Sequence, residues 1–285
     1  AGVTPTMLGT QLTLPSDSIP VVNSMVRFNS FAIKAVNENP LTINGWVDLS
    51  DLALMKMDLA MAARNMQLTG SERIRSADVY GKSFVDLDAR VKGDMRYLNV
   101  TAEADILPGT NVTYIVPGLT NEIARQSNQD MVKFVNFNDT TAVTAADSIN
   151  ETAMRMNIDA RLKISQGSTI GVDLSTDGKN RVQLQADGSV TYSMDYMNDE
   201  SFTGRININQ GFARYTPPLM GEKLFNFEEG SYVAFNGEMM NPVLNIKAND
   251  EIKANVSQSG ADTRQVTFNV ALTVTGTLES MNVVF

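Results

Sequence analysis

The sequence predicts an all-β protein. Apolar and polar residues alternate along most of the chain, which is the pattern of a sheet with one apolar and one polar face. Asn, Thr and Asp are abundant and helical spacing is rare. Many alternating segments are longer than the usual strand of about five or six residues. The pattern is clearest near the end of the chain, where one face carries Val266, Phe268, Val270, Leu272 and Val274 and the other carries Gln265, Thr267, Asn269, Ala271 and Thr273.

A first block of strands is expected within residues 1–116. Segment 54–69 places methionine, leucine and alanine on one face, and segment 95–107 does the same with leucine, valine, alanine and isoleucine. A strand of about twelve residues at ~3.3 Å per residue reaches roughly 40 Å, which is too wide for the core of a small closed barrel. The expected strands are 6–14, 26–36, 41–49, 54–69, 83–92, 95–107 and 111–116.

The alternation stops between residues 117 and 152. Pro117-Gly118 ends a strand, and the apolar residues that follow have weak helical spacing. From Asn138 the chain is small and polar. We expect a short helical or mobile insertion here, with one or two short helices followed by a loop.

A second block of strands is expected within residues 153–285, continuous with the first. Asp177-Gly178 and Asp187-Gly188 are hairpin signals, because such dipeptides suit the tight turns that join antiparallel strands. The segments flanking Asp187-Gly188 alternate well, so a hairpin is predicted most clearly there. The first strand of the block has one apolar face made of Met154, Met156, Ile158, Ala160, Leu162 and Ile164.

A degenerate internal repeat links the two blocks. Val26-Arg27-Phe28-Asn29 precedes Asn39-Pro40-Leu41-Thr42-Ile43, and Val233-Ala234-Phe235-Asn236 precedes Asn241-Pro242-Val243-Leu244. Repetition of this kind favours strand-and-turn units that stack in one direction.

Composition excludes several classes of function. The formal charge is −9 and no basic cluster is present, which disfavours nucleic acid and anionic membrane surfaces. The chain has no histidine and no cysteine, so it has no Ser-His-Asp triad and no thiolate metal site. We therefore expect no enzyme, no cofactor and no bound metal. No apolar run reaches the ~18 residues of a membrane span. We also expect this sequence to be a fragment of a longer chain.

Two residue groups have alternative interpretations. Asp86 and Asp88 share one strand face and could perform acid–base chemistry or bind calcium, but the solvated face of a sheet explains them better. The methionines on strand faces either fill a core or provide a soft wall for an irregular apolar guest, because thioethers adapt to irregular surfaces.

Several motifs resemble a known family. They are Phe202-Thr203-Gly204-Arg205, Gly211-Phe212-Ala213-Arg214-Tyr215, the segment from Phe225-Asn226-Phe227 to Gly230-Ser231-Tyr232-Val233, and Asn241-Pro242-Val243-Leu244-Asn245-Ile246. Upstream motifs are Leu12-Thr13-Leu14-Pro15, Asn39-Pro40-Leu41-Thr42, Val79-Tyr80-Gly81-Lys82 and Phe137-Asn138-Asp139-Thr140-Thr141. In this order they resemble the C-terminal domain family of TamB, the translocation and assembly module subunit, in its Bacteroidetes form.

The resemblance implies a fold, a location and partners. The family is similar to AsmA-like proteins of the bridge-like lipid transfer superfamily. Its fold is an elongated sheet bent into a U-shaped, solenoid-like "β-taco" trough with an apolar lumen. The implied protein is anchored in the inner membrane, reaches across the periplasm and serves outer-membrane biogenesis with a TamA-like outer-membrane barrel partner. The anchor and the partner-docking regions are expected outside this sequence.

We therefore expect the apolar faces to form a groove that shelters lipid acyl chains, from a phospholipid or another acyl-chain ligand. The alternatives are an assembly module for outer-membrane or autotransporter proteins and a structural surface β-protein. A chain of roughly sixteen carbons needs on the order of 12 kcal/mol of shelter in water, at about 0.8 kcal/mol per CH₂. The predicted groove-lining residues are Met55, Met57, Leu59, Met61, Leu98, Val100, Ile106, Met154, Met156, Ile158, Leu162, Val182, Leu184, Val190, Tyr192, Met194, Ile206, Ile208, Phe225, Phe227, Phe235, Leu244, Ile246, Val266, Phe268, Val270 and Leu272.

Overall fold

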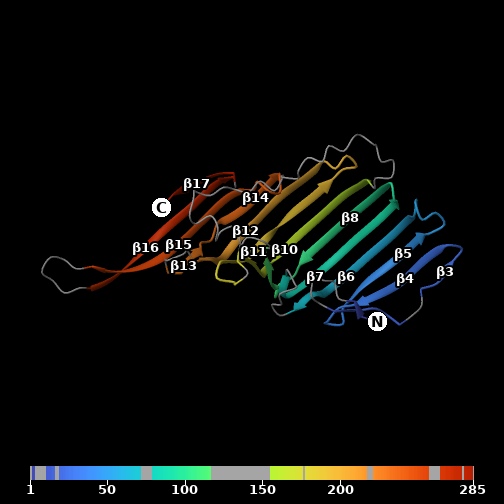
Figure 1. Cartoon of the computed structure of the whole chain (residues 1–285), viewed down its shortest axis with the longest axis horizontal. Coiled ribbons are helices and arrows are strands. Elements are labelled where there is room, and N and C mark those ends of the chain that lie inside the picture. Colours follow the sequence, from blue (N-terminus) through green and yellow to red (C-terminus); the bar gives the residue numbers. More distant parts are fainter. Residues whose placement is uncertain are drawn as a thin grey trace.

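A computed structural model of the chain describes residues 2–3, 11–16, 19–71, 79–116, 155–175, 177–216, 221–256, 264–277 and 279–284. These residues form strands and connecting turns and contain no helix, which confirms the predicted all-β class. The strands belong to one 17-stranded sheet. Figure 1 shows them side by side along the long axis of the molecule, from β4 near one end to β17 near the other. The insertion expected near 117–152 lies outside the described residues.

Most of the strands are long, and their bounds agree with the alternation in the sequence. The segment expected at 54–69 is β6, and the one expected at 95–107 is β8. The N-terminal strands are β1 (Gly2–Val3), β2 (Leu12–Thr13), β3 (Val21–Val22), β4 (Met25–Lys34), β5 (Pro40–Asp48), β6 (Lys56–Ser71), β7 (Val79–Asp94), β8 (Tyr97–Ile106) and β9 (Asn111–Ile115). The others are β10 (Arg155–Asp173), β11 (Arg181–Met194), β12 (Glu200–Tyr215), β13 (Lys223–Phe227), β14 (Ser231–Gly237), β15 (Val243–Val256), β16 (Arg264–Thr277) and β17 (Ser280–Val284).

Strand pairing is antiparallel except at β10, which runs parallel to β8 and β9. β8 and β9 lie end to end along β7, and β13 and β14 lie end to end along β12. The long β10 therefore pairs with the first half of the chain on one side and with β11 on the other. The repeated Asn-Pro motifs occupy equivalent places, since Pro40 opens β5 after β4 and Pro242 precedes β15 after β14.

The register gives the sheet two chemically different faces, because residues directly opposite each other on paired strands point to the same side. We call them the apolar face and the polar face. One row across the apolar face is Met61, Ala89, Ala102, Ala160, Tyr192 and Phe202. The adjacent row across the polar face is Ala60, Arg90, Thr101, Asp159, Ser193 and Ser201.

A line of strand irregularities, here called the crease, crosses the sheet from β6 to β14. Bulges bend strands and increase their twist, so a sheet with bulges aligned across its strands bends along that line. The result is compatible with a trough. The crease consists of Arg64–Asn65 in β6, residues 107–110 between β8 and β9, residues 165–167 in β10, Asn209 in β12 and residues 228–230 between β13 and β14.

Buried hydroxyl groups stabilise the crease by bonding the backbone groups that the irregularities release. Thr110 Oγ1 accepts a hydrogen bond from the Phe84 N–H at 3.0 Å, and Ser168 Oγ donates to the carbonyl of Leu107 at 3.1 Å. Ser231 Oγ accepts from the Lys247 N–H at 2.9 Å. All three hydroxyl side chains are almost fully buried. An unpaired buried backbone group is costly, so these residues fix where the sheet bends.

The hairpin predicted at Asp187-Gly188 is wrong, because β11 continues through these residues. Gly188 has a φ of +145°, and a Cβ built on it would lie 2.2 Å from the carbonyl oxygen of Arg205 on β12. Asp187 accepts a hydrogen bond at 2.6 Å from Nδ2 of Asn209, the β12 residue of the crease. The dipeptide therefore marks a close approach of two strands and not a turn. The hairpin predicted at Asp177-Gly178 is confirmed as the β10–β11 connection.

Candidate functional site

The apolar face is the candidate functional site. It bears all the predicted lining residues that lie in described strands, namely Met57, Leu59, Met61, Leu98, Val100, Ile106, Met156, Ile158, Leu162, Val182, Leu184, Val190, Tyr192, Met194, Ile206, Ile208, Phe225, Phe227, Phe235, Leu244, Ile246, Val266, Phe268, Val270 and Leu272. Met55 lies in the connection before β6, and Met154 lies outside the described residues.

Most side chains on this face are only half-buried, including Ile158, Leu162 and Leu184. Among the described residues, ten hydrophobic side chains are buried, and most of the apolar face lies outside that set. Phe268 is 48% exposed. Because no second layer of described strands covers this face, its apolar atoms are accessible to a ligand.

At one place, apolar side chains of this face are buried against one another. Ala35, Ala63 and Met66 form a small buried cluster, and the partly buried residues packed against it include Leu12 and Leu41. Ala63 and Met66 flank the β6 part of the crease, so apolar side chains meet where the sheet bends. Self-packing of this kind supports the bend while leaving the wider face open.

Charge is rare on the apolar face. Among its described residues in β4–β12, the single charged side chain is Glu200, at the first position of β12. Burial and, after it, the nearby Glu200 carboxylate raise the pKa of Tyr192 above its usual value. Tyr192 therefore stays neutral across the physiological range. A face with so little charge can accept hydrocarbon without first desolvating ions.

Two neighbouring parts of the apolar face differ in side-chain type. β6–β10 supply methionine, alanine and branched aliphatic residues, such as Met61, Ala102 and Ile158. β11–β14 add aromatic rings, and Phe202 and Phe235 pack edge to face with their ring centroids 4.7 Å apart. Adaptable thioethers and flat rings both contact irregular apolar ligands well.

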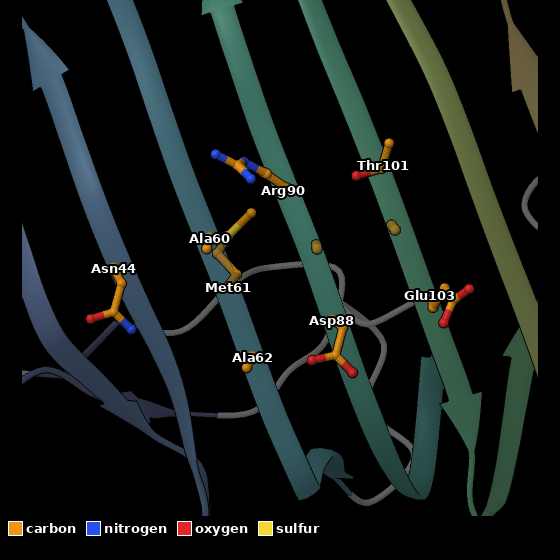
Figure 2. A pocket seen from close by; sticks show the side chains of 10 residues that line it. Asn44, Ala60, Met61, Ala62, Asp88, Arg90, Thr101 and Glu103 are labelled. Atoms are coloured by element: carbon orange, nitrogen blue, oxygen red, sulfur yellow. The ribbon is translucent and has the colours of Figure 1, made fainter.

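Several charged side chains of the polar face pair with one another. Figure 2 shows Asp88, Arg90, Thr101 and Glu103 projecting from β7 and β8. They line a shallow hollow of about 410 Å³. Arg90 makes two hydrogen bonds to the carboxylate of Asp58, at 2.9 and 2.8 Å. The other side chains on this hollow face the solvent.

Asp86 and Asp88 belong to this polar face, as the solvated interpretation expected. Asp86 accepts a hydrogen bond from the backbone N–H of Asn65 at 2.7 Å, and Asp88 pairs with Arg64 at 2.9 Å. Both therefore support the β6 part of the crease. Within the described ranges, no group of three or more acidic side chains could hold a metal ion.

Sequence reasoning missed a buried polar network beyond the crease. The Asp173 carboxylate is fully buried and accepts hydrogen bonds from Arg181 Nε at 2.6 Å and from the Tyr80 hydroxyl at 2.9 Å. Burial and then the bond to Asp173 raise the pKa of Tyr80. The network ties β7, β10 and β11 together. Asp173 and Arg181 flank the predicted Asp177-Gly178 turn, so their ion pair could have been predicted from the sequence. The contact with Tyr80 could not, because Tyr80 is distant in the sequence.

The comparisons with known proteins agree with this geometry. The sequence matches the family model of the TamB C-terminal domain over residues 29–285. The chain belongs to the TamB C-terminal domain family. TamB proteins are envelope-associated, non-enzymatic modules of outer-membrane protein assembly or lipid transport, and they work with partner outer-membrane proteins. No curated protein matches the chain in sequence. The Bacteroidetes type remains a prediction.

The TamB assignment fits a surface without reactive groups. The described part of the chain contains no helix that could span a membrane. What the site offers chemically is a broad, nearly uncharged apolar surface carried by a sheet whose bend is held by buried hydroxyls. Such a surface can bind and release apolar material.

Proposed function

We propose that this segment shelters lipid acyl chains on its apolar face during passage between the inner and outer membranes. The observation that carries the proposal is the continuity of the apolar face from β4 to β16, with its side chains half-exposed. A closed core would bury these residues. A solvated sheet would not place apolar side chains at every second position of so many strands on one surface with so little charge.

The energetics suit transport better than storage. Each CH₂ removed from water contributes about 0.8 kcal/mol of favourable free energy. Contact with the partly exposed face therefore offsets a large part of the free-energy cost of moving an acyl chain through an aqueous space. Similar side chains recur on neighbouring strands, which are about 4.8 Å apart. A tail therefore meets a series of similar positions and not one deep site, and it can slide along the face.

The proposal places the segment in the periplasm, as part of a chain anchored in the inner membrane. Its cargo is a phospholipid or another lipid with acyl chains, and its outer-membrane contact is a TamA-like barrel protein that binds regions outside this sequence. Support comes from membership in the TamB family together with the apolar face.

Lipid binding by the purified segment tests the proposal, measured as lipid recovered by mass spectrometry and as transfer between donor and acceptor vesicles. Ile158→Asp and Leu184→Arg each place a charge on the apolar face and should lower lipid recovery and transfer at least tenfold. Thr101→Asp places a negative charge on the polar face, opposite Asp159, and is the matched control for Ile158→Asp. Equal transfer by all variants, with the sheet intact by circular dichroism, would contradict the proposal.

A second candidate function is assembly of outer-membrane proteins, and β17 favours it, since its pairing within the described part of the chain is with β16. Met281, Val283 and Val284 are 42%, 46% and 54% exposed, and β17 pairs with β16 on one side. An exposed edge with free backbone groups can add a strand from another protein. Photo-crosslinks from β17 to a client strand, unchanged by Ile158→Asp, would support this function over lipid transfer.

A further inference from the structure

Two opposite charges interrupt the apolar face where β13 begins and β15 runs beyond it. Lys223 is the first residue of β13 and lies opposite Tyr215. Asp250 lies in β15, two positions beyond Ala248. Each occupies a position at which the alternation of its strand calls for an apolar side chain, such as the neighbouring Phe225 on β13. We call Lys223 and Asp250 the face charges, and sequence reasoning did not single them out.

The register places both face charges on the same face as the proposed acyl chains. Phe227 and Ala248 lie opposite each other on the apolar face. Lys223 is four residues from Phe227 along β13, and Asp250 is two residues from Ala248 along β15. Side chains an even number of residues apart in a regular strand point to one side, so both charges point to the apolar face. A lipid can therefore contact them while its tails stay on that face.

The face charges have no partner within the described part of the chain. Both side chains are half-buried, and neither makes an ion pair or a side-chain hydrogen bond with a described residue. The nearby Glu222 carboxylate lies 3.8 Å from Arg214 Nε. The described β13–β15 pairing ends at Asn226 and Asn249, and Figure 1 shows β15 continuing beside β16 past β13. Half-buried charges without partners are unfavourable, so the arrangement favours a ligand that supplies both signs of charge.

The spacing of the face charges suits a ligand that lies between them. Extending the described register places Asp250 beside Phe225, with Lys223 as its diagonal neighbour. Diagonal neighbours on one face of antiparallel strands are about 7–8 Å apart. A phosphoethanolamine headgroup carries an anionic phosphate and a cationic ammonium joined by two carbons. It can therefore accept a hydrogen bond from Lys223 through its phosphate and donate one to Asp250 through its ammonium.

The charge balance at this place distinguishes between headgroups. Lys223 attracts a phosphate, but Asp250 on the same face repels a ligand that carries only negative charge. The charged neighbours along β15, Lys247 and Glu251, are exposed and point to the polar face. A headgroup with both signs and no net charge is therefore favoured over an anionic headgroup and over free phosphate.

Aromatic side chains surround the face charges. Phe225 and Phe227 follow Lys223 on the apolar face of β13, and Phe268 on β16 is 48% exposed. Tyr215, opposite Lys223, is 46% exposed. A tyrosine has an apolar ring and a polar hydroxyl, which suits the boundary between hydrocarbon and water. The surroundings therefore match the junction between the acyl chains and the headgroup of a lipid.

We propose that Lys223 and Asp250 bind the phosphate and the ammonium of a zwitterionic phospholipid headgroup of the phosphoethanolamine class. The acyl chains of this lipid lie on the apolar face beside Phe225 and Phe227. The proposal rests on the proposed function, because the tails must occupy that face. It assigns the cargo a headgroup class and an orientation, with the headgroup where β13 begins and the tails directed towards the crease.

Calorimetric titration of the whole segment with four probes tests the inference. The probes are dioctanoyl phosphatidylethanolamine, dioctanoyl phosphatidylglycerol, dioctanoylglycerol and free phosphoethanolamine. The first three share their tails and carry a zwitterionic headgroup, an anionic headgroup or no phosphate, and the fourth is the zwitterionic headgroup without tails. We expect phosphatidylethanolamine to bind about tenfold more tightly than dioctanoylglycerol and about threefold more tightly than phosphatidylglycerol.

Single substitutions separate the two contacts. Lys223→Gln should bring the affinity for phosphatidylethanolamine close to that for dioctanoylglycerol, and Asp250→Asn should remove the preference over phosphatidylglycerol. Both variants should keep the affinity for dioctanoylglycerol within about twofold, which shows that the sheet is intact. Lys247→Gln and Glu251→Gln are the matched controls, because they remove the same kinds of charge from the polar face of β15, and they should change no affinity.

The outcomes separate this inference from the proposed function. If no probe with acyl chains binds, the proposed function fails and the inference fails with it. If the three lipids bind equally, or both variants bind as the unchanged chain does, the headgroup site is wrong while the apolar face still binds tails. If Lys223→Gln alone alters phospholipid binding, the site accepts any phosphate and the zwitterionic assignment is overturned. If free phosphoethanolamine binds as tightly as the phospholipid, the site is one for small zwitterions, and the inference is again overturned.

Discussion

The two faces of this sheet share every strand and every backbone hydrogen bond, yet they perform different tasks. On β10, Ile158 and Leu162 present uncharged, half-exposed hydrocarbon, while Asp159 and Arg161 between them present charge to water. The apolar face has few polar groups and is proposed to bind cargo. The polar face pairs several of its charges and, beyond the crease, contains the buried network around Asp173. Binding and stability therefore belong largely to different residues, which can be altered separately.

The largest expected effect on stability comes from the network on the polar side. Asp173→Ala leaves the Arg181 guanidinium, 27% exposed, and the Tyr80 hydroxyl without their shared partner. We expect a loss of about 3 kcal/mol in the free energy of unfolding, measured by urea denaturation. Asp159→Ala, an exposed position on the same strand, should change it by less than ~0.5 kcal/mol. Equal effects of the two variants would show that the network is not structural.

The next effect is on the apolar side, where two strands approach closely at Gly204. Its φ is +132°, and an added Cβ would lie 2.3 Å from the carbonyl oxygen of Ser189. Gly204→Ala should cost about 2 kcal/mol of stability, through both backbone strain and the clash. Gly237→Ala is the matched control, since Gly237 has a φ of +119° and no atom within 4 Å of an added Cβ. A cost no larger than that of Gly237→Ala would contradict the close approach.

A smaller effect tests the crease. Ser231→Ala removes the hydroxyl that accepts from the Lys247 N–H and donates to the carbonyl of Glu228 at 2.8 Å. Loss of these buried hydrogen bonds should cost about 1–2 kcal/mol, measured as the shift in the urea midpoint. The exposed Ser189→Ala variant should be nearly neutral. If Ser231→Ala is also neutral, the buried hydroxyls do not hold the bend.

The smallest effect concerns charge on the polar face. The side-chain hydrogen bonds from Arg90 lower the pKa of Asp58 below its ordinary value. A carboxylate with a lowered folded-state pKa contributes stability that is present at neutral pH and is lost as the pH falls through that pKa. The urea midpoint should therefore decrease between pH 7 and pH 3. The double variant Asp58→Asn/Arg90→Gln should show a smaller decrease, and an unchanged decrease would exclude this pair as a source.

Much of the fold was predictable because alternation is a local property. The faces of β6, β8 and β10 follow directly from residues such as Met61, Val100 and Ile158, and the structure places them as expected. Asp187-Gly188 was misread because the same dipeptide suits a tight turn and a close approach of strands, and only the pairing with β12 distinguishes the two.

The features that were missed depend on contacts between distant segments. Tyr80 meets Asp173 because β10 runs parallel to β8 and β9. A pattern within one strand carries no information about its neighbour, so this network could not be assembled from alternation alone. The line of bulges across the sheet was hidden in the same way.

The most direct test of the central claim is to map lipid contact along one strand at single-residue spacing. A photo-crosslinking amino acid is placed in turn at each of residues 156–163 of β10, and covalent lipid adducts are measured by mass spectrometry after loading with phospholipid vesicles. We predict adducts at Met156, Ile158, Ala160 and Leu162 and background levels at Asn157, Asp159, Arg161 and Lys163. Equal labelling of both sets, or labelling of the second set, would contradict the assignment of cargo to the apolar face.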